Sequence, residues 1–285
     1  MGLGVLFSQK DLKKGARGGD KISPTLKRVI VAVIALPPFY LYITKLPPIF
    51  FLLLLTTVSV LAQMEFHAMY KTNRLISFSG IISGVILLCL PLIQPSGFSL
   101  QTLSFIFPFM LMACTRLFLI KDPSSSLKDI SPAVVGFLYI PNLLLAQWHL
   151  RLRGYEWILF LYGCVWASDS LAYYIGKGMG KRRLYKEVSP NKTIAGAFGS
   201  VIGGMLSALL LGKLMMDNIA FYVLIAMGIA IGSITIVGDL IESMFKRDAG
   251  VKDSGSFIPG HGGILDKIDG ALFAGPLLYW ITLIL

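Results

Sequence analysis

Charged side chains are scarce in this sequence. Only 14% of its 285 residues are Asp, Glu, Lys or Arg, whereas 55% are hydrophobic. A soluble domain of this size carries about 25% charge. Apolar runs of about 18 residues or more, long enough to span a bilayer, recur along most of the chain. The scarcity of charge therefore excludes an ordinary soluble protein and indicates a polytopic membrane protein.

Cysteine and targeting signals are scarce as well. The three cysteines, Cys89, Cys114 and Cys164, lie in apolar runs without the spacing of a metal site or a disulfide framework. We expect them to be small buried hydrophobic residues. Residues 1–26 are polar and rich in Gly and Lys, and they show no cleavable signal pattern. They are expected to form a cytosolic tail.

The apolar runs are continuous, which favours helices over the alternating strands of a membrane barrel. We therefore expect an all-α fold with about nine transmembrane helices. The predicted spans are residues 29–43, 49–63, 76–93, 103–120, 132–147, 157–175, 194–211, 219–245 and 264–285.

The orientation follows from the distribution of Lys and Arg. With the N-terminus in the cytosol and the C-terminus outside, only four of the 26 basic residues lie outside, and the opposite orientation reverses this bias. The net charge of +11 points first to topology and to anionic lipid. The cell inner (plasma) membrane is the expected location, and no nucleic-acid partner is expected.

Polar and charged residues concentrate in the second half of the chain. Residues 27–155 are predicted to form a transmembrane scaffold, and residues 156–285 a catalytic region with two basic cytosolic loops, 177–192 and 246–263. Acids flank these loops at or near membrane depth, where an ionisable group needs a partner. They are Asp169, Asp239, Glu242, Asp266 and Asp269.

Helical spacing places some of these acids on shared faces. Asp239 and Ser243 are four residues apart, and Asp266 and Asp269 are three apart. The loop between the two helices ties them together, so the faces are expected to converge at the cytosolic surface. Converging carboxylates beside lysines suit Mg²⁺ and phosphate, whereas simple ion pairs with the nearby lysines are the alternative.

A glycine cluster, PGHGG at residues 259–263, precedes the last helix. Glycines let backbone N–H groups approach an anion, and a helix N-terminus favours negative charge. A plain turn is the alternative. In the other loop, the SPNKT stretch breaks the chain at Ser189 and starts a helix after Lys192, without the Walker A spacing of a P-loop. The small residues that follow, such as Gly199 and Gly203, favour close helix packing.

These motifs together resemble the signature of CDP-diacylglycerol synthases, the phosphatidate cytidylyltransferases. The resemblance rests on SMFKR from Ser243, KD from Lys252, PGHGG from Pro259 and DKID from Asp266, with SPNKT as a second block. It covers about residues 160–285. The sequence departs at Lys267, where the family usually has Arg, and at 194–195, where Ile-Ala replaces Trp-Glu.

The resemblance implies that CTP and phosphatidic acid give CDP-diacylglycerol and pyrophosphate at a lipid bilayer. It implies that Asp239 and Asp266 bind the principal Mg²⁺, and that Asp269 or Asp169 serves a second cation, divalent or monovalent such as K⁺. The remaining residues of the implied site bind nucleotide, lipid phosphate or pyrophosphate. They are Ser189, Lys192, Ser243, Lys246, Arg247, Lys252, Asp253, Gly260, His261, Gly262, Gly263 and Lys267.

Two rival functions remain at this point. A CTP-dependent polyprenol or phytol kinase shares the membrane and the nucleotide but yields CDP. An ion or phosphate transporter would use the acids for transport and would show matching halves, which the sequence lacks. The glycine-rich spans also suggest a homodimer.

Overall fold

The computed structural model describes residues 36–93, 98–120, 122–255 and 262–285. Two compact units are present, residues 1–44 and Lys45–Leu285. In the first unit, residues 36–44 lie in a helix.

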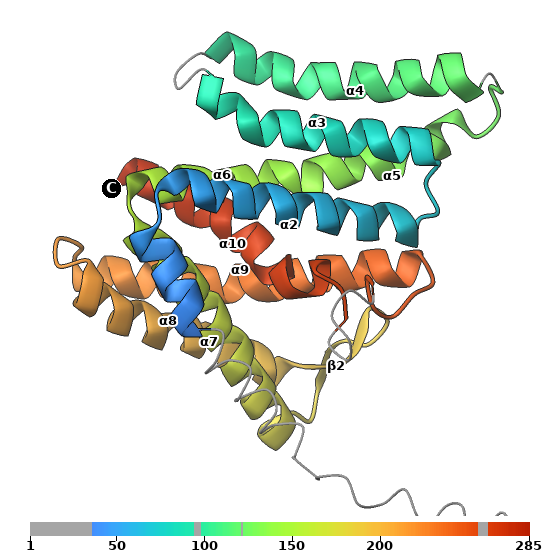
Figure 1. Ribbon diagram of the computed structural model, residues 1–285. Helices are drawn as coiled ribbons and strands as arrows, with labels where there is room; N and C mark the ends of the chain where they lie inside the picture. Colours follow the sequence, from blue (N-terminus) through green and yellow to red (C-terminus); the bar gives the residue numbers. More distant parts are fainter. Residues whose placement is uncertain (1–35, 94–97, 121, 256–261) are drawn as a thin grey trace, which may run out of the picture. The chain divides into compact units, whose positions relative to one another are not determined.

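The second unit is built almost entirely from helices (Figure 1). Its elements are α2 (Pro48–Met69), α3 (Arg74–Ile93), α4 (Phe98–Ile120), α5 (Ser126–Tyr139), α6 (Pro141–Arg153), α7 (Tyr155–Met179), β1 (Arg183–Tyr185), β2 (Ser189–Thr193), α8 (Ile194–Met215), α9 (Phe221–Asp248) and α10 (Leu265–Ile284).

Seven helical segments in the described part of the chain are long and apolar enough to cross a membrane. Large apolar side chains such as Leu53, Phe78 and Leu210 are more than half exposed on them, which suits lipid and would be costly in water. The expected span at 29–43 lies largely outside the described residues, and α4 contributes the shorter apolar stretch Phe105–Ile120. The chain is thus a multi-pass membrane protein, and nine spans stays a prediction.

The predicted span at 132–147 corresponds to two helices, α5 and α6, which together form one membrane-length segment. They are separated at Ile140, whose backbone stays in the right-handed helical region but is distorted, with φ of −102° and ψ of −76°. The cause is Pro141, which has no N–H to donate and whose ring disfavours helical geometry in the residue before it.

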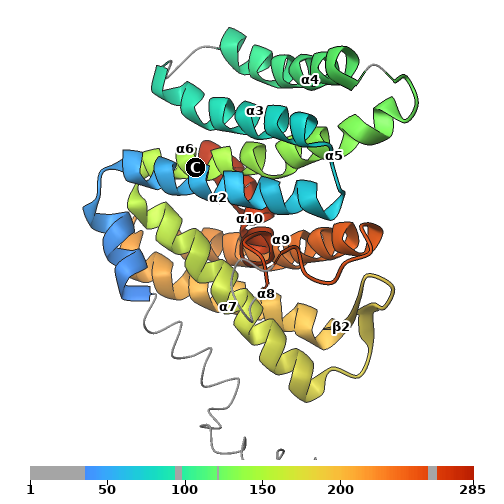
Figure 2. The same ribbon diagram turned by 45° about the vertical axis from the view of Figure 1, so that its right-hand side comes forward.

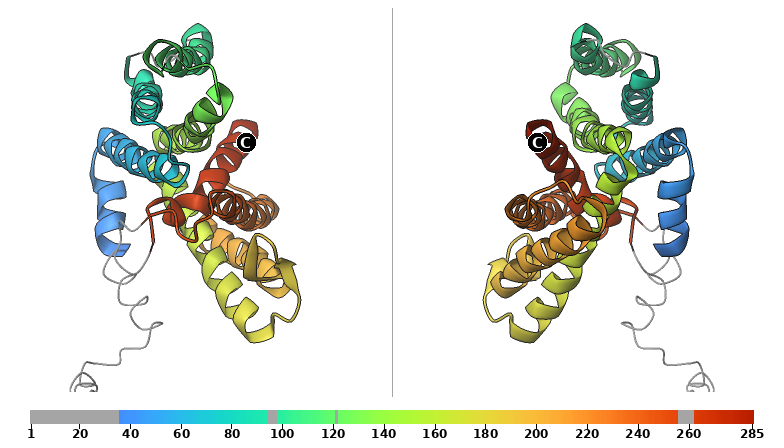
Figure 3. Two further views of the ribbon diagram at one scale, coloured as in Figure 1. Left: turned by 90° about the vertical axis from the view of Figure 1, so that its right-hand side faces the viewer. Right: turned by 90° about the vertical axis from the view of Figure 1, so that its left-hand side faces the viewer.

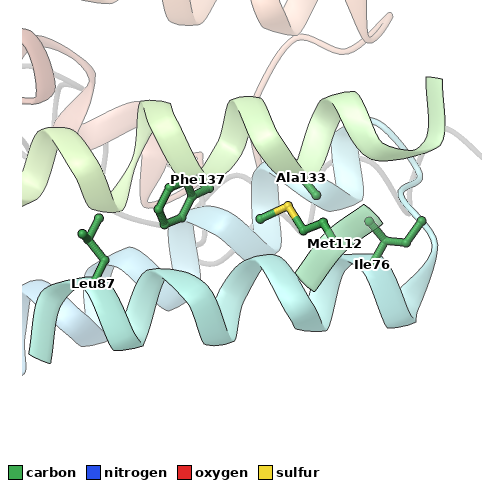
Figure 4. Packing of buried hydrophobic residues seen from close by; sticks show 5 residues of the cluster. All are labelled: Ile76, Leu87, Met112, Ala133 and Phe137. Atoms are coloured by element: carbon green, nitrogen blue, oxygen red, sulfur yellow. The ribbon is translucent and has the colours of Figure 1, made fainter. Parts of the chain in front are cut away.

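A hydrophobic cluster joins α3, α4 and α5. Ile76 and Leu87 of α3 pack with Met112 of α4 and with Ala133 and Phe137 of α5 (Figure 4), and all five side chains are buried.

Helices α7, α8 and α9 approach one another closely through glycine. A Cβ added at Gly203 of α8 would lie 2.5 Å from the backbone oxygen of Ala167 in α7, and one at Gly204 would lie 2.4 Å from that of Gly228 in α9. The Ser200 hydroxyl also donates to the Gly232 carbonyl at 2.9 Å. The prediction that these small residues serve helix packing is confirmed, and α7 and α8 run side by side (Figures 2 and 3).

The loop after α7 folds into an antiparallel hairpin of β1 and β2 (Figure 2). The predicted all-α fold class is confirmed, and this short hairpin is the one departure from helix among the described elements. Arg183 faces Thr193 and Tyr185 faces Ser189 across the two strands. Pro190 is tolerated because a two-stranded ribbon has only edge strands. Thr193 then caps α8 by accepting the Gly196 N–H at 3.1 Å, which confirms that a helix starts after Lys192.

Candidate active site

The two polar loops predicted to be functional meet at one end of the helices. The C-terminal ends of α7 and α9 and the N-terminal ends of α8 and α10 lie there, because consecutive helices in this region run in opposite directions. Arg247, near the end of α9, donates from Nε to the carbonyl of Val188 in the hairpin turn at 3.3 Å. The loops therefore belong to one polar region.

A cavity of about 690 Å³ opens between α7, the hairpin, α8 and α9. Its volume falls within the range of about 300–1,000 Å³ usual for ligand pockets. Both signs of charge line it, with Asp169 and Asp239 opposite Lys177, Arg183 and Lys192. Ser189, Asn191 and Thr193 add polar groups. The lining suits a ligand that carries several negative charges and a bound cation.

Lys192 and Asp239 form an ion pair across this cavity. The Lys192 Nζ lies 2.5 Å from the Asp239 Oδ1, and both side chains are only partly buried. Lys192 belongs to β2 and Asp239 to α9. The hairpin thus carries a cation to the acid that the sequence singled out on the neighbouring helix.

Three carboxylates gather beside the cavity. One oxygen each of Asp239, Glu242 and Asp269 lie within 4.8 Å of one another. Helices α9 and α10 come together here because Gly238 has no side chain: an added Cβ would lie 2.6 Å from the Asp269 carbonyl oxygen. Carboxylates this close repel one another unless a cation compensates them.

This group fits a magnesium ion. Mg²⁺ prefers carboxylate oxygens and keeps further positions for water and phosphate oxygens. The Glu242 side chain is only 1% exposed, and its Oε1 atom is buried without a hydrogen bond from any described residue. A buried carboxylate oxygen with an unused lone pair lacks a partner. Coordination of a metal ion would supply that partner.

Lys246 lies between two carboxylates. Its Nζ is 2.6 Å from Glu242 Oε2 on the same helix and 2.5 Å from Asp266 Oδ1 on α10. The Lys246 side chain is only 10% exposed. The expected convergence of the α9 and α10 faces is therefore present, and one buried cation serves both of them.

Asp266 is fully engaged by protein groups. Its Oδ2 accepts the backbone N–H of Gly263 at 2.8 Å and that of Ser254 at 3.0 Å, together with the Ser254 hydroxyl at 2.9 Å. Gly262 has φ of +84°, a conformation that favours glycine. The N–H of Gly263 thus serves Asp266, and the carboxylate organises the start of α10.

Glu65 of α2 reaches the same segment. Its Oε1 accepts the N–H of Ile264 at 2.9 Å. Its Oε2 accepts the N–H of Leu265 at 3.0 Å and the Ser254 hydroxyl at 3.0 Å. An acid from the N-terminal half of the chain therefore caps α10, where exposed N–H groups stabilise negative charge.

Tyr70, just after α2, adds a second contact between the halves. Its hydroxyl donates to Asp248 Oδ2 at 2.9 Å and lies 3.3 Å from the Phe245 carbonyl. Burial, followed by the hydrogen bond to Asp248 and its charge, raises the pKa of Tyr70 well above its ordinary value. The phenol therefore stays a neutral donor at physiological pH.

The predicted site residues divide into groups. Asp169, Asp239, Ser189 and Lys192 line the cavity, and Asp269 joins the acidic group. Asp266, Lys246 and Gly263 form the buried network. The other described residues belong to none of these groups. They are Ser243, which is buried, the exposed Arg247, Lys252, Asp253 and Lys267, and the partly exposed Gly262. Gly260 and His261 lie outside the described residues.

Sequence reasoning gave no role to Glu242 and missed Glu65. Both are acids in apolar helices, and that alone signals a partner because an unpaired charge at membrane depth is costly. Nothing in the spacing of Glu65 connects it to a segment about 200 residues later. Only the packing of α2 against the second half reveals its partners.

Comparison with known proteins identifies the family of the chain. The profile of the Cytidylyltransferase family matches residues 26–285. The phosphatidate cytidylyltransferase of Staphylococcus saprophyticus is 34% identical over 261 residues, which cover 88% of this chain and 96% of the relative. The enzymes of that name from Staphylococcus epidermidis and Staphylococcus aureus are 33% and 32% identical with the same coverage. The chain therefore belongs to the cytidylyltransferase family.

Proposed function

We propose that this protein transfers the cytidylyl group of CTP to phosphatidic acid and so forms CDP-diacylglycerol and pyrophosphate. The observation that carries the proposal is the cavity between the hairpin and α7 to α9, which lysine and arginine side chains line together with Asp169 and Asp239, and beside which Asp239 gathers with two further acids. Relatives that match almost their full length carry the name of this activity.

The reaction needs positioning and charge neutralisation more than a strong base. A phosphate oxygen of phosphatidic acid attacks the α-phosphorus of CTP, a new P–O bond forms, and the bond to the β-phosphate oxygen breaks as pyrophosphate leaves. The phosphate monoester is already ionised near neutral pH. Holding two anions in line and compensating their charge then accounts for most of the catalysis.

The acidic residues have different proposed roles in this reaction. Asp239, Glu242 and Asp269 would hold Mg²⁺, which when bound neutralises negative charge on the phosphates. From the sequence, Asp239 and Asp266 were expected to bind the principal Mg²⁺ together. Because Asp266 is engaged by Lys246 and backbone N–H groups, we assign it the role of ordering the start of α10. Asp169 lines the same cavity as Asp239 and would help a second cation.

The basic residues bind the anionic substrates. Lys177, Arg183 and Lys192 line the cavity and would contact the triphosphate. Arg247, Lys252 and Lys267 are exposed at the same end of the helices, where they would attract the phosphate of the lipid. The roles expected of Ser189, Ser243, Asp253, Gly260, His261 and Gly262 in substrate binding stay proposals.

The membrane setting follows the charge distribution. The end of the helices that carries the cavity is the more basic one, so we propose that it faces the cytosol of a bacterial inner membrane, with the N-terminus inside and the C-terminus outside. CTP then reaches the cavity from water, and phosphatidic acid enters from the inner leaflet. A homodimer stays a proposal that cross-linking in membranes tests, because glycines such as Gly203 and Gly204 already serve packing within the chain.

Purified protein in detergent with [α-³²P]CTP, phosphatidic acid and Mg²⁺ tests the function. We expect label in a lipid product and an equal amount of pyrophosphate. Free labelled CDP together with a phosphorylated polyprenol or phytol would instead indicate the kinase. Absence of any lipid-dependent turnover, with the protein folded, would contradict the proposal.

A further inference from the structure

We infer that Glu65 is a positioning residue for cytidylyl transfer, acting through Asp266 and Lys246. The inference rests on the proposed function. Glu65 lies on α2, far in sequence from the signature segment, yet its carboxylate contacts that segment through three donors, the N–H groups of Ile264 and Leu265 and the hydroxyl of Ser254.

An unbroken chain of contacts leads from Glu65 to the acidic group. The Ser254 hydroxyl lies 3.0 Å from the Glu65 carboxylate and 2.9 Å from that of Asp266, so its single proton is shared between them, and the Ser254 N–H donates to Asp266 at 3.0 Å. Asp266 contacts Lys246, and Lys246 contacts Glu242. Glu242 is a member of the group with Asp239 and Asp269. A displacement of Glu65 is therefore passed to the acids through short polar contacts.

The backbone passes close to the Glu65 carboxylate at two glycines. A Cβ added at Gly255 would meet three Glu65 atoms first, at 2.7, 2.8 and 3.0 Å. One added at Gly263 would lie 2.3 Å from Glu65 Oε2 and 2.1 Å from the Ser254 hydroxyl. The segments on both sides of the loop thus close around this one side chain.

A cap alone would stabilise α10 without affecting the reaction. Glu65 differs because it and Asp266 share Ser254, and because Asp266 holds the buried Lys246. Misplacement of reacting groups by about 1 Å can cost 10²-fold in rate. Loss of Glu65 should therefore lower the turnover of correctly folded enzyme and not only the amount of it.

The test uses four variants of the full chain and one control. The variants are Glu65→Gln, Glu65→Ala, Gly255→Ala and the double variant Glu65→Ala with Gly255→Ala. Glu156→Gln is the matched control, because Glu156 is also an acid on a membrane-length helix and lies about 20 Å along α7 from Asp169 at 1.5 Å per residue. Each protein is assayed for kcat and for KM of CTP, per folded molecule.

We expect kcat to fall about 10-fold in Glu65→Gln and about 100-fold in Glu65→Ala, with KM changed much less, because orientation is lost while the cavity remains. Amide hydrogen exchange should accelerate in a peptide covering residues 262–272 of both variants. Gly255→Ala should resemble Glu65→Gln. In the Glu65→Ala background it should add less than about 2-fold, because the side chain it displaces is gone.

Several results would overturn the inference. They are a kcat within about 2-fold of wild type in both Glu65 variants, an equal loss in Glu156→Gln, or independent effects of Glu65→Ala and Gly255→Ala. If Glu65→Ala does not accumulate, Glu65→Gln and Gly255→Ala decide by the same kcat criterion. A folded wild-type protein without transferase activity would instead contradict the proposed function.

Discussion

Lys192 and Asp239 are paired across the wall of the cavity, with 2.5 Å between Nζ and Oδ1. The pair joins a short hairpin to a long apolar helix, so a residue from a surface loop reaches an acid at the end of a span. An ion pair that is partly open to water contributes little to stability. Its place beside the cavity therefore points to ligand binding.

Replacing Asp239 by Asn should lower cytidylyl transfer by about 10²–10³-fold, because a ligand is removed from the proposed Mg²⁺, which compensates the charge of the reacting phosphates. Folding should change little, since Asp239 is only partly buried. The control is Asp217→Asn, an exposed acid in the loop between α8 and α9, at their opposite end. Radiolabelled CDP-lipid formation measures both. Near-normal transfer by Asp239→Asn would contradict its assignment.

Glu242→Gln and Asp269→Asn should each weaken binding of Mn²⁺, used as a probe for Mg²⁺, by at least about 10-fold, because ligand groups and their supports control metal affinity to this extent. Electron paramagnetic resonance of the purified protein measures free Mn²⁺ without any need for turnover. Glu187→Gln, in the exposed hairpin turn, should bind as wild type does. Unchanged affinity in both test variants would remove the metal from this acidic group.

Lys246→Met should destabilise the fold by about 3–5 kcal/mol, because removing one partner of a buried ion pair leaves uncompensated charge. Glu242 and Asp266 both lose their cation. Adding Glu242→Gln should restore part of the loss by removing one of the two charges. Unfolding in detergent measures these effects. Lys181→Met, at an exposed position, should stay within about 0.5 kcal/mol of wild type.

Gly203→Ala should destabilise the protein by about 1–3 kcal/mol through overpacking. The added Cβ would meet the Ala167 backbone oxygen of α7 at 2.5 Å. Gly178→Ala is the matched control, because this α7 glycine has no atom within 4 Å of an added Cβ. It should be neutral or stabilise the helix by up to about 1 kcal/mol. Equal effects of the two substitutions on thermal unfolding would contradict close packing at Gly203.

The convergence of α9 and α10 was predictable because it rests on local rules. Acids three or four residues apart share a helix face, and a short loop keeps the two helices together, so Asp239 and Asp269 were expected to meet. Which acids join Asp239 as metal ligands was harder to predict. Asp266 was expected, whereas the acids that lie with Asp239 are Glu242 and Asp269. Which oxygen faces a neighbour and which accepts a backbone N–H depends on helix rotation, and the sequence does not set that rotation.

The hairpin and the contacts of Glu65 were not predicted from the sequence, for different reasons. The strands Arg183–Tyr185 and Ser189–Thr193 are very short, and strand formation depends on the partner more than on intrinsic preference. Glu65 is a single acid in an apolar helix, which signals a partner but does not identify it. Long apolar segments, by contrast, were located well because the bilayer fixes their length.

The capping of α10 by a side chain of α2 bears on how relatives can be recombined. A chimera that took residues 27–155 from one cytidylyltransferase and the rest from another would join two independently evolved surfaces at Glu65. A chimera should be active only if both source enzymes have an acid at the position of Glu65 and a small residue at the position of Gly255. The boundary between the two halves is therefore a poor crossover point, even though composition changes there.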